Sequence, residues 1–294
     1  MSESMTISAL ARQCGIAPVT LRAWERRYGL IQPVRSTKGH RLYPREQIER
    51  VQQIMLWINR GVPVGQVREL LERDAPQWSE DSPWHAQRLQ LLEAVQTQNE
   101  RRLDDAFNQA LSLYPAHTLC AQLLLPLLEE LTPSRSGRQL EAVFFHTWLR
   151  SKLGLRVYQL NLPLKEAPVL LVNMGDAVLE PQLWLLAWLL AQRGQRVEVL
   201  DWPLPAPELL QWQEQRSAHA MVLYASGKLT SPLALEQLDD LRQRCQASVL
   251  LAGPCCSIYA EQLPPEEHLS DPLQAFSALQ QLGLSALNDK EIAL

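Results

Sequence analysis

The sequence has no run of about 18 uninterrupted apolar residues. It also has no early segment that joins a basic start, an apolar stretch and a small-residue cleavage site. We therefore expect no membrane-spanning helix and no secretory signal, and predict a soluble, cytoplasmic protein. Cysteine is scarce: the five cysteines are odd in number and lack the spacing of a disulfide framework, which fits a reducing compartment.

Catalytic and metal-binding signatures are lacking as well. The apolar run over 169–174 is followed by one glycine, Gly175, and not by a glycine-rich phosphate loop. No Ser-His-Asp set or pair of carboxylates has a convincing arrangement. Cys255 and Cys256 are adjacent and could form a redox or metal pair, but two ordinary thiols are preferred because no other cysteine or histidine partner is near. We expect neither an enzyme nor a metal site.

Charge is distributed unevenly along the chain. Residues 1–73 contain twelve Lys/Arg and six Asp/Glu, a net charge of +6, which leaves −10 for the remainder. A basic head on an acidic body indicates a polyanionic partner for the head alone, because the body would be repelled by a nucleic acid.

Two short helices are predicted at the start of the basic head. Thr6 suits an N-cap and Gly15 the left-handed position after a helix over 7–14. Pro18 and Gly29 bound the second helix in the same way. Two short helices joined by a tight turn predict a helix-turn-helix.

The rest of the head predicts a hairpin and two further helices. Residues 30–43 contain two short runs on either side of a bend at 36–39. Helices are expected over about 44–60 and 64–73. Four basic side chains would project from the hairpin: Arg35, Lys38, His40 and Arg41.

The order of residues in the head resembles one family of regulators. The strings are Thr20-Leu21-Arg22-x-Trp24-Glu25-Arg26-Arg27-Tyr28-Gly29-Leu30, then Pro33-x-Arg35, then Gly39-His40-Arg41-Leu42-Tyr43. They are similar to the signature of MerR-family transcription regulators and cover the first quarter of the chain. The resemblance implies a winged helix-turn-helix DNA-binding domain over residues 1–75.

The expected DNA-binding residues lie on the second helix and the hairpin. Thr20 and Arg22 stand near the helix start, where base edges are usually reached. Residues farther along, and the hairpin, would meet the phosphate backbone. A solvated basic face is the alternative for the arginines, and a core position is the alternative for Trp24 and Tyr28. The expected set is Thr20, Arg22, Trp24, Arg26, Arg27, Tyr28, Arg35, Lys38, Gly39, His40, Arg41 and Tyr43.

The body predicts two further domains after a linker at 74–83. Helical spacing over 84–160 indicates a four-helix bundle. The resemblance to MerR regulators implies that this bundle is similar to a cobalamin cap. Short apolar runs alternate with helical segments over 166–285, which predicts a Rossmann-like, doubly wound parallel sheet. The fold class is thus multidomain α and α/β, and a ligand would bind at the carboxyl ends of the strands.

This order of domains resembles the light- and cobalamin-responsive branch of MerR regulators. That branch carries Asp/Glu-x-His-x-x-Gly after the first strand, with the histidine as a cobalt ligand. Here the segment begins at Asp176, and Val178 and Pro181 replace the histidine and the glycine. A second motif of the branch, a Trp followed by Glu-His, is matched at His146 alone, with Arg135 at the Trp position.

An isopropyl side chain cannot coordinate cobalt, so we expect no cofactor and a degenerate cobalamin-binding-like domain. The alternative is an adenosylcobalamin-dependent, light-responsive repressor. The resemblance implies double-stranded promoter DNA, a second copy of the chain and RNA polymerase as partners. A signalling protein bound by the C-terminal region is a further expected partner, and no membrane is. Activation and repression are both compatible with the residues.

Overall fold

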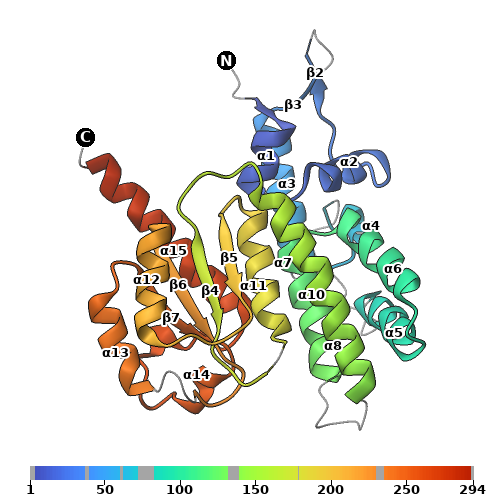
Figure 1. The fold of residues 1–294 in the computed structure, drawn as a ribbon. Coiled ribbons are helices and arrows are strands. Elements are labelled where there is room, and N and C mark those ends of the chain that lie inside the picture. Colours follow the sequence, from blue (N-terminus) through green and yellow to red (C-terminus); the bar gives the residue numbers. More distant parts are fainter. Residues whose placement is uncertain are drawn as a thin grey trace. The chain divides into compact units, whose positions relative to one another are not determined.

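The computed structural model describes residues 4–36, 40–59, 62–71, 83–131, 139–177, 179–229 and 235–292. The chain forms two compact units, residues 1–145 and 146–294 (Figure 1). The first unit holds the predicted head together with most of the predicted bundle. The finer division into domains over 1–75, 84–160 and 166–285 stays a prediction.

The helix-turn-helix forms with the predicted caps. In α1 (Ile7–Cys14) the Thr6 hydroxyl accepts a hydrogen bond from the Ala9 N–H at 3.3 Å, and Gly15 follows at a φ of +66°. In α2 (Pro18–Arg26) the proline stands at the first helical position, where its missing N–H costs nothing. This helix ends before the predicted limit, and Gly29, at a φ of +58°, turns the chain away.

A three-stranded antiparallel sheet forms the wing. It consists of β1 (Met5–Thr6), β3 (Arg41–Tyr43) and β2 (Val34–Arg35), in that spatial order. The hairpin of β2 and β3 is the predicted one, and most of its bend lies outside the described residues. β1 was not predicted, because two residues are too few to show the alternation of a strand.

Helices make up the rest of the first unit. After α3 (Arg45–Asn59) and α4 (Val64–Leu71) come α5 (Pro83–Gln96) and α6 (Glu100–Leu113). The next predicted helix is divided into α7 (Ala116–Leu119), a π-helical turn (Cys120–Leu124) and α8 (Leu125–Glu130). Pro126 cannot donate to the carbonyl one turn earlier, that of Gln122, and the Arg88 guanidinium donates to it instead at 3.3 Å. The long helix α10 (Gln139–Asn161) contains the boundary between the two units.

The second unit is built on a parallel sheet of four strands. The strands are β4 (Val169–Asn173), β5 (Val197–Leu200), β6 (Ala220–Tyr224) and β7 (Ser248–Ala252), in the spatial order β5-β4-β6-β7. The main helices are α11 (Pro181–Gln192), α12 (Ala206–Arg216), α13 (Leu235–Arg244) and α15 (Pro272–Ile292), and the short α14 (Cys255–Ile258) and a 3₁₀ turn (Pro265–Glu267) follow β7. The predicted strand–helix alternation is confirmed, with each strand within two residues of its predicted limits.

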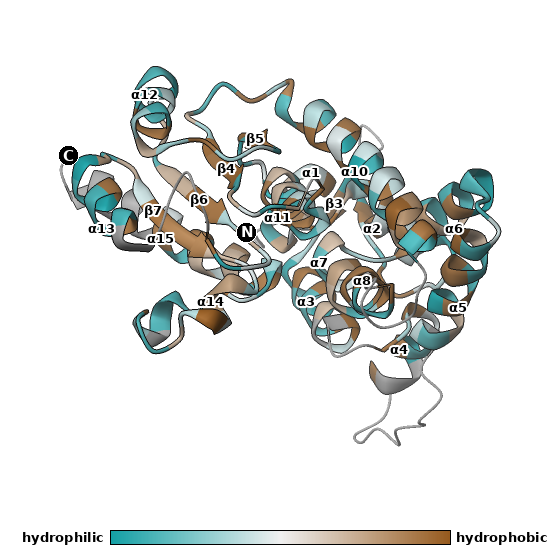
Figure 2. Cartoon of the chain, turned by 60° about the horizontal axis from the view of Figure 1, so that its bottom comes forward, coloured by the Kyte–Doolittle hydropathy of each residue, from teal (hydrophilic) through white to brown (hydrophobic). Residues whose placement is uncertain are grey.

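The helices of this unit pack in two pairs, α11 with α15 and α12 with α13. Figure 2 shows the strands mostly brown, whereas α12 and α13 alternate brown with teal. That pattern is expected for buried parallel strands covered by amphipathic helices. Helix α11 is buried on nearly all sides, which explains its almost continuous apolar sequence.

Side chains bond to the backbone of one residue on each outer strand of this sheet. The Asn161 amide donates to the Val197 carbonyl at 2.7 Å and accepts from the Val197 N–H at 3.2 Å. On β7, Arg242 donates to the Val249 carbonyl at 3.3 Å and is fixed by an ion pair with Glu267 at 2.6 Å. Among the residues described, no helix is both long enough and apolar enough to cross a bilayer.

Candidate nucleic-acid interface

The outer face of α2 is cationic. Arg22 and Arg26 stand one turn apart on it and Arg27 follows directly, and all three side chains are exposed. None of the three forms an ion pair with another described residue. Their guanidinium groups are therefore available to phosphate oxygens and to the edges of guanine.

Three of the predicted DNA-binding residues are instead fully buried: Thr20, Trp24 and Tyr43. The indole N–H of Trp24 donates to the carbonyl of Leu113, at the end of α6, at 2.9 Å. The core alternative for Trp24 is thus the one that the structure favours. The hydroxyls of Thr20 and Tyr43 are buried without a hydrogen-bond partner among the described residues, so they do not face the surface where DNA would lie.

An ion pair fixes the wing to α2. The Nε of Arg41, on β3, lies 2.7 Å from a carboxylate oxygen of Glu25, on α2, and this hydrogen bond raises the pKa of the guanidinium. Arg41 thus holds the wing in position against α2, and it also adds a positive charge to the wing. The sequence showed both residues but not their contact, since they are separated by the whole hairpin.

The other predicted residues are spread over this surface. Arg35 and His40 are exposed on the wing, and the Ser36 N–H donates to the His40 carbonyl at 2.9 Å to hold the hairpin together. Tyr28 is half buried, with its ring next to Gly65. Lys38 and Gly39 lie outside the described residues. The structure thus brings together one exposed basic helix face and a wing tied to it.

A single substitution tests whether Thr20 touches DNA. We expect Thr20→Val to raise the free energy of unfolding by about 1 kcal/mol, because it removes a buried hydroxyl without a partner. DNA affinity should stay unchanged. Denaturant unfolding and a DNA-binding titration measure the two quantities. Thr118→Val is the matched control: Thr118 is equally buried but has an interaction partner, so valine should destabilise there. If the Thr20→Val variant folded normally but lost DNA affinity, the prediction would be wrong and Thr20 would contact DNA.

Polar side chains also gather at the carboxyl ends of β4 and β5. Asp201 follows β5 and accepts from the Trp184 indole N–H and from the Arg150 guanidinium, each at 2.6 Å. The same guanidinium lies over the Trp184 ring, 4.5 Å from its centroid, in a cation–π contact. Asn173, at the end of β4, donates to the carbonyls of Ala177 and Asp201. These groups satisfy one another and hold the segment after β4.

Glu180 is the buried acid of this edge. It is 4% exposed, and its carboxylate accepts from the Ser226 hydroxyl at 2.6 Å. Burial raises the pKa of Glu180, and the hydrogen bond from Ser226 opposes that rise. A carboxyl whose pKa is raised by folding stabilises the fold less as the pH rises above its unfolded value.

We therefore expect Glu180→Gln to raise the free energy of unfolding by an amount that grows as the pH rises above the ordinary pKa of a glutamate. Below the ordinary pKa of a glutamate both folded and unfolded chains are protonated, so the difference should be smallest there. Urea unfolding at several pH values measures it. Glu208→Gln, at an exposed position on α12, is the control and should show a much smaller dependence. A stability advantage of the Glu180→Gln variant that shrank with rising pH would contradict the assignment.

Two positions of the cobalamin-binding motifs carry no ligand for cobalt, since neither the side chain of Val178 nor that of Arg135 is a suitable one. Both residues lie outside the described parts of the chain. Pro181 is buried as the first residue of α11. His146 is half buried, and burial lowers its pKa. Within the described parts of the chain, no three His, Cys, Asp or Glu side chains are placed to hold a metal ion.

The adjacent cysteines are built into the core. Cys255 and Cys256 are both fully buried and carry free thiols. The thiols donate to the carbonyls of Ala252 and Leu251, at 3.4 and 3.5 Å. The interaction with the Cys255 thiol lowers the pKa of Cys256, and the interpretation of two ordinary thiols stays a prediction.

Comparisons with known proteins agree with the prediction that the basic head is a MerR-type DNA-binding domain. Residues 5–74 match the family model described as MerR HTH family regulatory protein. The HTH-type transcriptional regulator MlrA of Salmonella typhimurium strain LT2 is 35% identical over 196 residues, which are 66% of this chain and 79% of that protein. MlrA of Escherichia coli strain K12 is 34% identical over the same shares. The HTH-type transcriptional repressor CarA of Myxococcus xanthus is 30% identical over 215 residues, 70% of this chain and 71% of its own.

Proposed function

Since the chain belongs to the MerR family of DNA-binding transcription regulators, we propose that α2 reads its operator in the major groove while the wing holds the flanking backbone. The observation that carries this proposal is the exposed face of Arg22, Arg26 and Arg27 on α2. An α-helix fits the major groove, and arginine can bind guanine with two hydrogen bonds. The ion pair between Arg41 and Glu25 supports it, because it fixes the angle between wing and helix.

The chain acts on DNA as a homodimer in this proposal. Two copies of one helix-turn-helix related by a twofold axis read two inverted half-sites, so the operator is palindromic or nearly so. RNA polymerase is then a partner on the promoter, as for a regulator that distorts the DNA between promoter elements. No catalytic role is assigned, and the relatives found are named as regulators or repressors of transcription.

Selection from a random duplex library tests the specificity. The full chain, retained with bound DNA through several rounds at moderate salt, should enrich one motif with inverted half-sites. The affinity for that motif should exceed the affinity for unrelated duplexes by about a thousandfold or more. Equal binding of all duplexes under those conditions would contradict a sequence-specific regulator.

The second unit is a sensory or partner-binding module without a cobalt cofactor in this proposal. Its supporting observation is the mutual satisfaction of Asp201, Trp184 and Arg150 at the edge where a ligand of such sheets binds. Its input is a protein or another ligand.

A direct binding measurement tests the absence of cobalamin. The chain, mixed with adenosylcobalamin in the dark and then desalted, is expected to retain no corrinoid absorption. The Val178→His variant supplies the missing cobalt ligand, and it is measured in the same way for comparison. Retained colour in the unaltered chain would favour the light-responsive repressor instead.

A further inference from the structure

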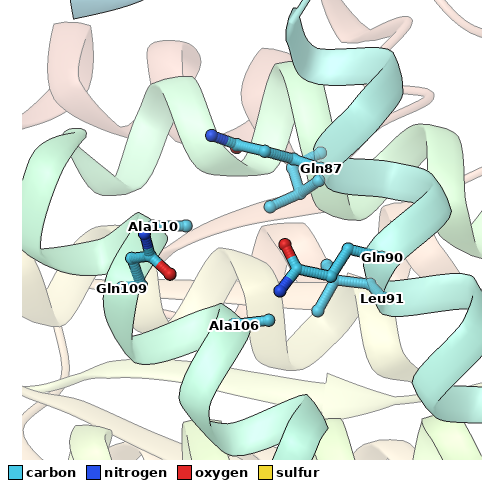
Figure 3. A pocket seen from close by; sticks show the side chains of 7 residues that line it. Gln87, Gln90, Leu91, Ala106, Gln109 and Ala110 are labelled. Carbon is cyan, nitrogen blue, oxygen red and sulfur yellow. The ribbon is translucent and has the colours of Figure 1, made fainter.

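A small pocket opens between α5 and α6 in the first unit. Three glutamine side chains converge on it, Gln87 and Gln90 from α5 and Gln109 from α6 (Figure 3). Its volume is about 70 Å³. The remaining lining residues are small or apolar: Leu91, Ala106, Ala110 and Leu123. The two alanines stand one turn apart on α6, where larger side chains would fill the space.

The lining selects the chemistry of an occupant. Each glutamine amide offers donors and an acceptor, and no lining residue is charged. The Oε1 of Gln87 is buried without a hydrogen-bond partner among the described residues. A turn of this amide towards the pocket would let it bond to a ligand. An ion would lose its hydration with no opposite charge in return.

The size of the pocket limits the occupant further. Sites for whole drug-sized molecules measure about 300–1,000 Å³, several times more than this one. A pocket of about 70 Å³ holds a group of only a few heavy atoms. A primary carboxamide or a urea has that size and is uncharged. Its N–H groups and its oxygen can bond to the acceptors and donors of the glutamine amides.

The pocket is connected to the DNA-binding helix. Burial raises the pKa of Tyr114, and the interactions of its hydroxyl with the Gln87 side chain and with the backbone of Val64, at the start of α4, oppose that rise. The Tyr114 ring lies against Trp84, with the centroids 4.4 Å apart. The residue before it, Leu113, accepts the hydrogen bond from Trp24 of α2. These contacts connect Gln87 to the end of α6 on which α2 rests.

We propose that this pocket binds the carboxamide or urea group of a small uncharged molecule, and that its occupancy changes the affinity of α2 for DNA. The binding half of the proposal stands on the lining of the pocket alone. The effect on DNA rests on the proposed function, in which α2 reads the operator.

Saturation-transfer NMR on the full chain tests the binding half, with acetamide as the probe and acetate, its charged isostere, as the comparison. Acetamide should receive saturation at millimolar concentration and acetate should not. Ala106→Leu fills the pocket and should weaken acetamide binding by about tenfold or more, because the leucine side chain occupies the space of the ligand. Gln109→Met should weaken it by severalfold, since it removes one amide at the exposed rim. Ala86→Leu adds the same side chain at an exposed position of α5 and should change nothing.

The results separate the alternatives. Equal signals from acetamide and acetate, or no signal from either, would overturn the site. Unchanged binding by the Ala106→Leu chain would place acetamide elsewhere and overturn it too.

A DNA titration with and without acetamide tests the coupling. The affinity for the selected motif should change with acetamide in the unaltered and Ala86→Leu chains but not in the Ala106→Leu chain. A chain that binds acetamide in the pocket with no change in DNA affinity would refute the coupling. A chain that binds no specific DNA in any condition would refute the proposed function and leave the NMR result standing.

Discussion

Replacing Trp24 by alanine is expected to lower the free energy of unfolding by about 3–5 kcal/mol. Trp24 is fully buried and is among the largest buried side chains of the chain, so the substitution leaves a cavity. It also removes the N–H that the Leu113 carbonyl accepts at 2.9 Å. Denaturant unfolding followed by circular dichroism measures the loss.

Trp24→Phe separates the two contributions. It keeps most of the apolar volume and removes the indole N–H, so we expect a smaller loss, of about 1–3 kcal/mol for a buried acceptor left without a partner. Under conditions where each variant is folded, specific DNA binding should remain detectable. A Trp24→Ala chain of unaltered stability that failed to bind DNA would show that the indole acts at the DNA and not in the core.

Arg22→Ala is expected to weaken binding to the selected operator by about tenfold to a hundredfold, the equivalent of about 1–3 kcal/mol for a base contact made by arginine. The preference at one base position should relax with it. Because Arg22 is exposed, the stability of the fold should be nearly unchanged. Fluorescence anisotropy with the operator and with single-base variants of it measures both effects.

Two further substitutions show whether the effect of Arg22→Ala is specific to a base contact. Arg26→Ala should weaken binding to all sequences alike and reduce the slope of log affinity against log salt by about 1, as expected for a phosphate contact. Arg101→Ala, at an exposed position of α6, should change neither quantity. If Arg22→Ala and Arg101→Ala were indistinguishable, α2 would not be the reading helix.

Local features of the head were readable from the sequence because their causes are local. Thr6, Gly15 and Pro18 act on the backbone within one turn of their own position, and they bound α1 and α2 as expected. The strands of the second unit were equally clear, since each is a short apolar run between turn residues. The exposed arginines of α2 follow from the same spacing.

The contacts that decide which residues face DNA are not local. Trp24 and Leu113 are 89 positions apart, so no periodicity could have paired them. The signature that makes Thr20, Trp24 and Tyr43 conspicuous is equally compatible with burial, and a sequence pattern does not separate a residue that reads DNA from one that supports the reader. The glutamine pocket escaped notice for a related reason, because its amides come from two helices and resemble ordinary surface residues.

The side chains bonded to the outer strands of the parallel sheet affect how readily another chain can pair with those strands. An open strand edge is a template on which a second chain can continue the sheet, as in fibres and in peptide ligands that bind by strand addition. Asn161 occupies the N–H and the carbonyl of Val197, and Arg242 occupies the carbonyl of Val249. A chain that continued the sheet at either strand would have to displace these side chains, which makes strand addition less favourable at both positions.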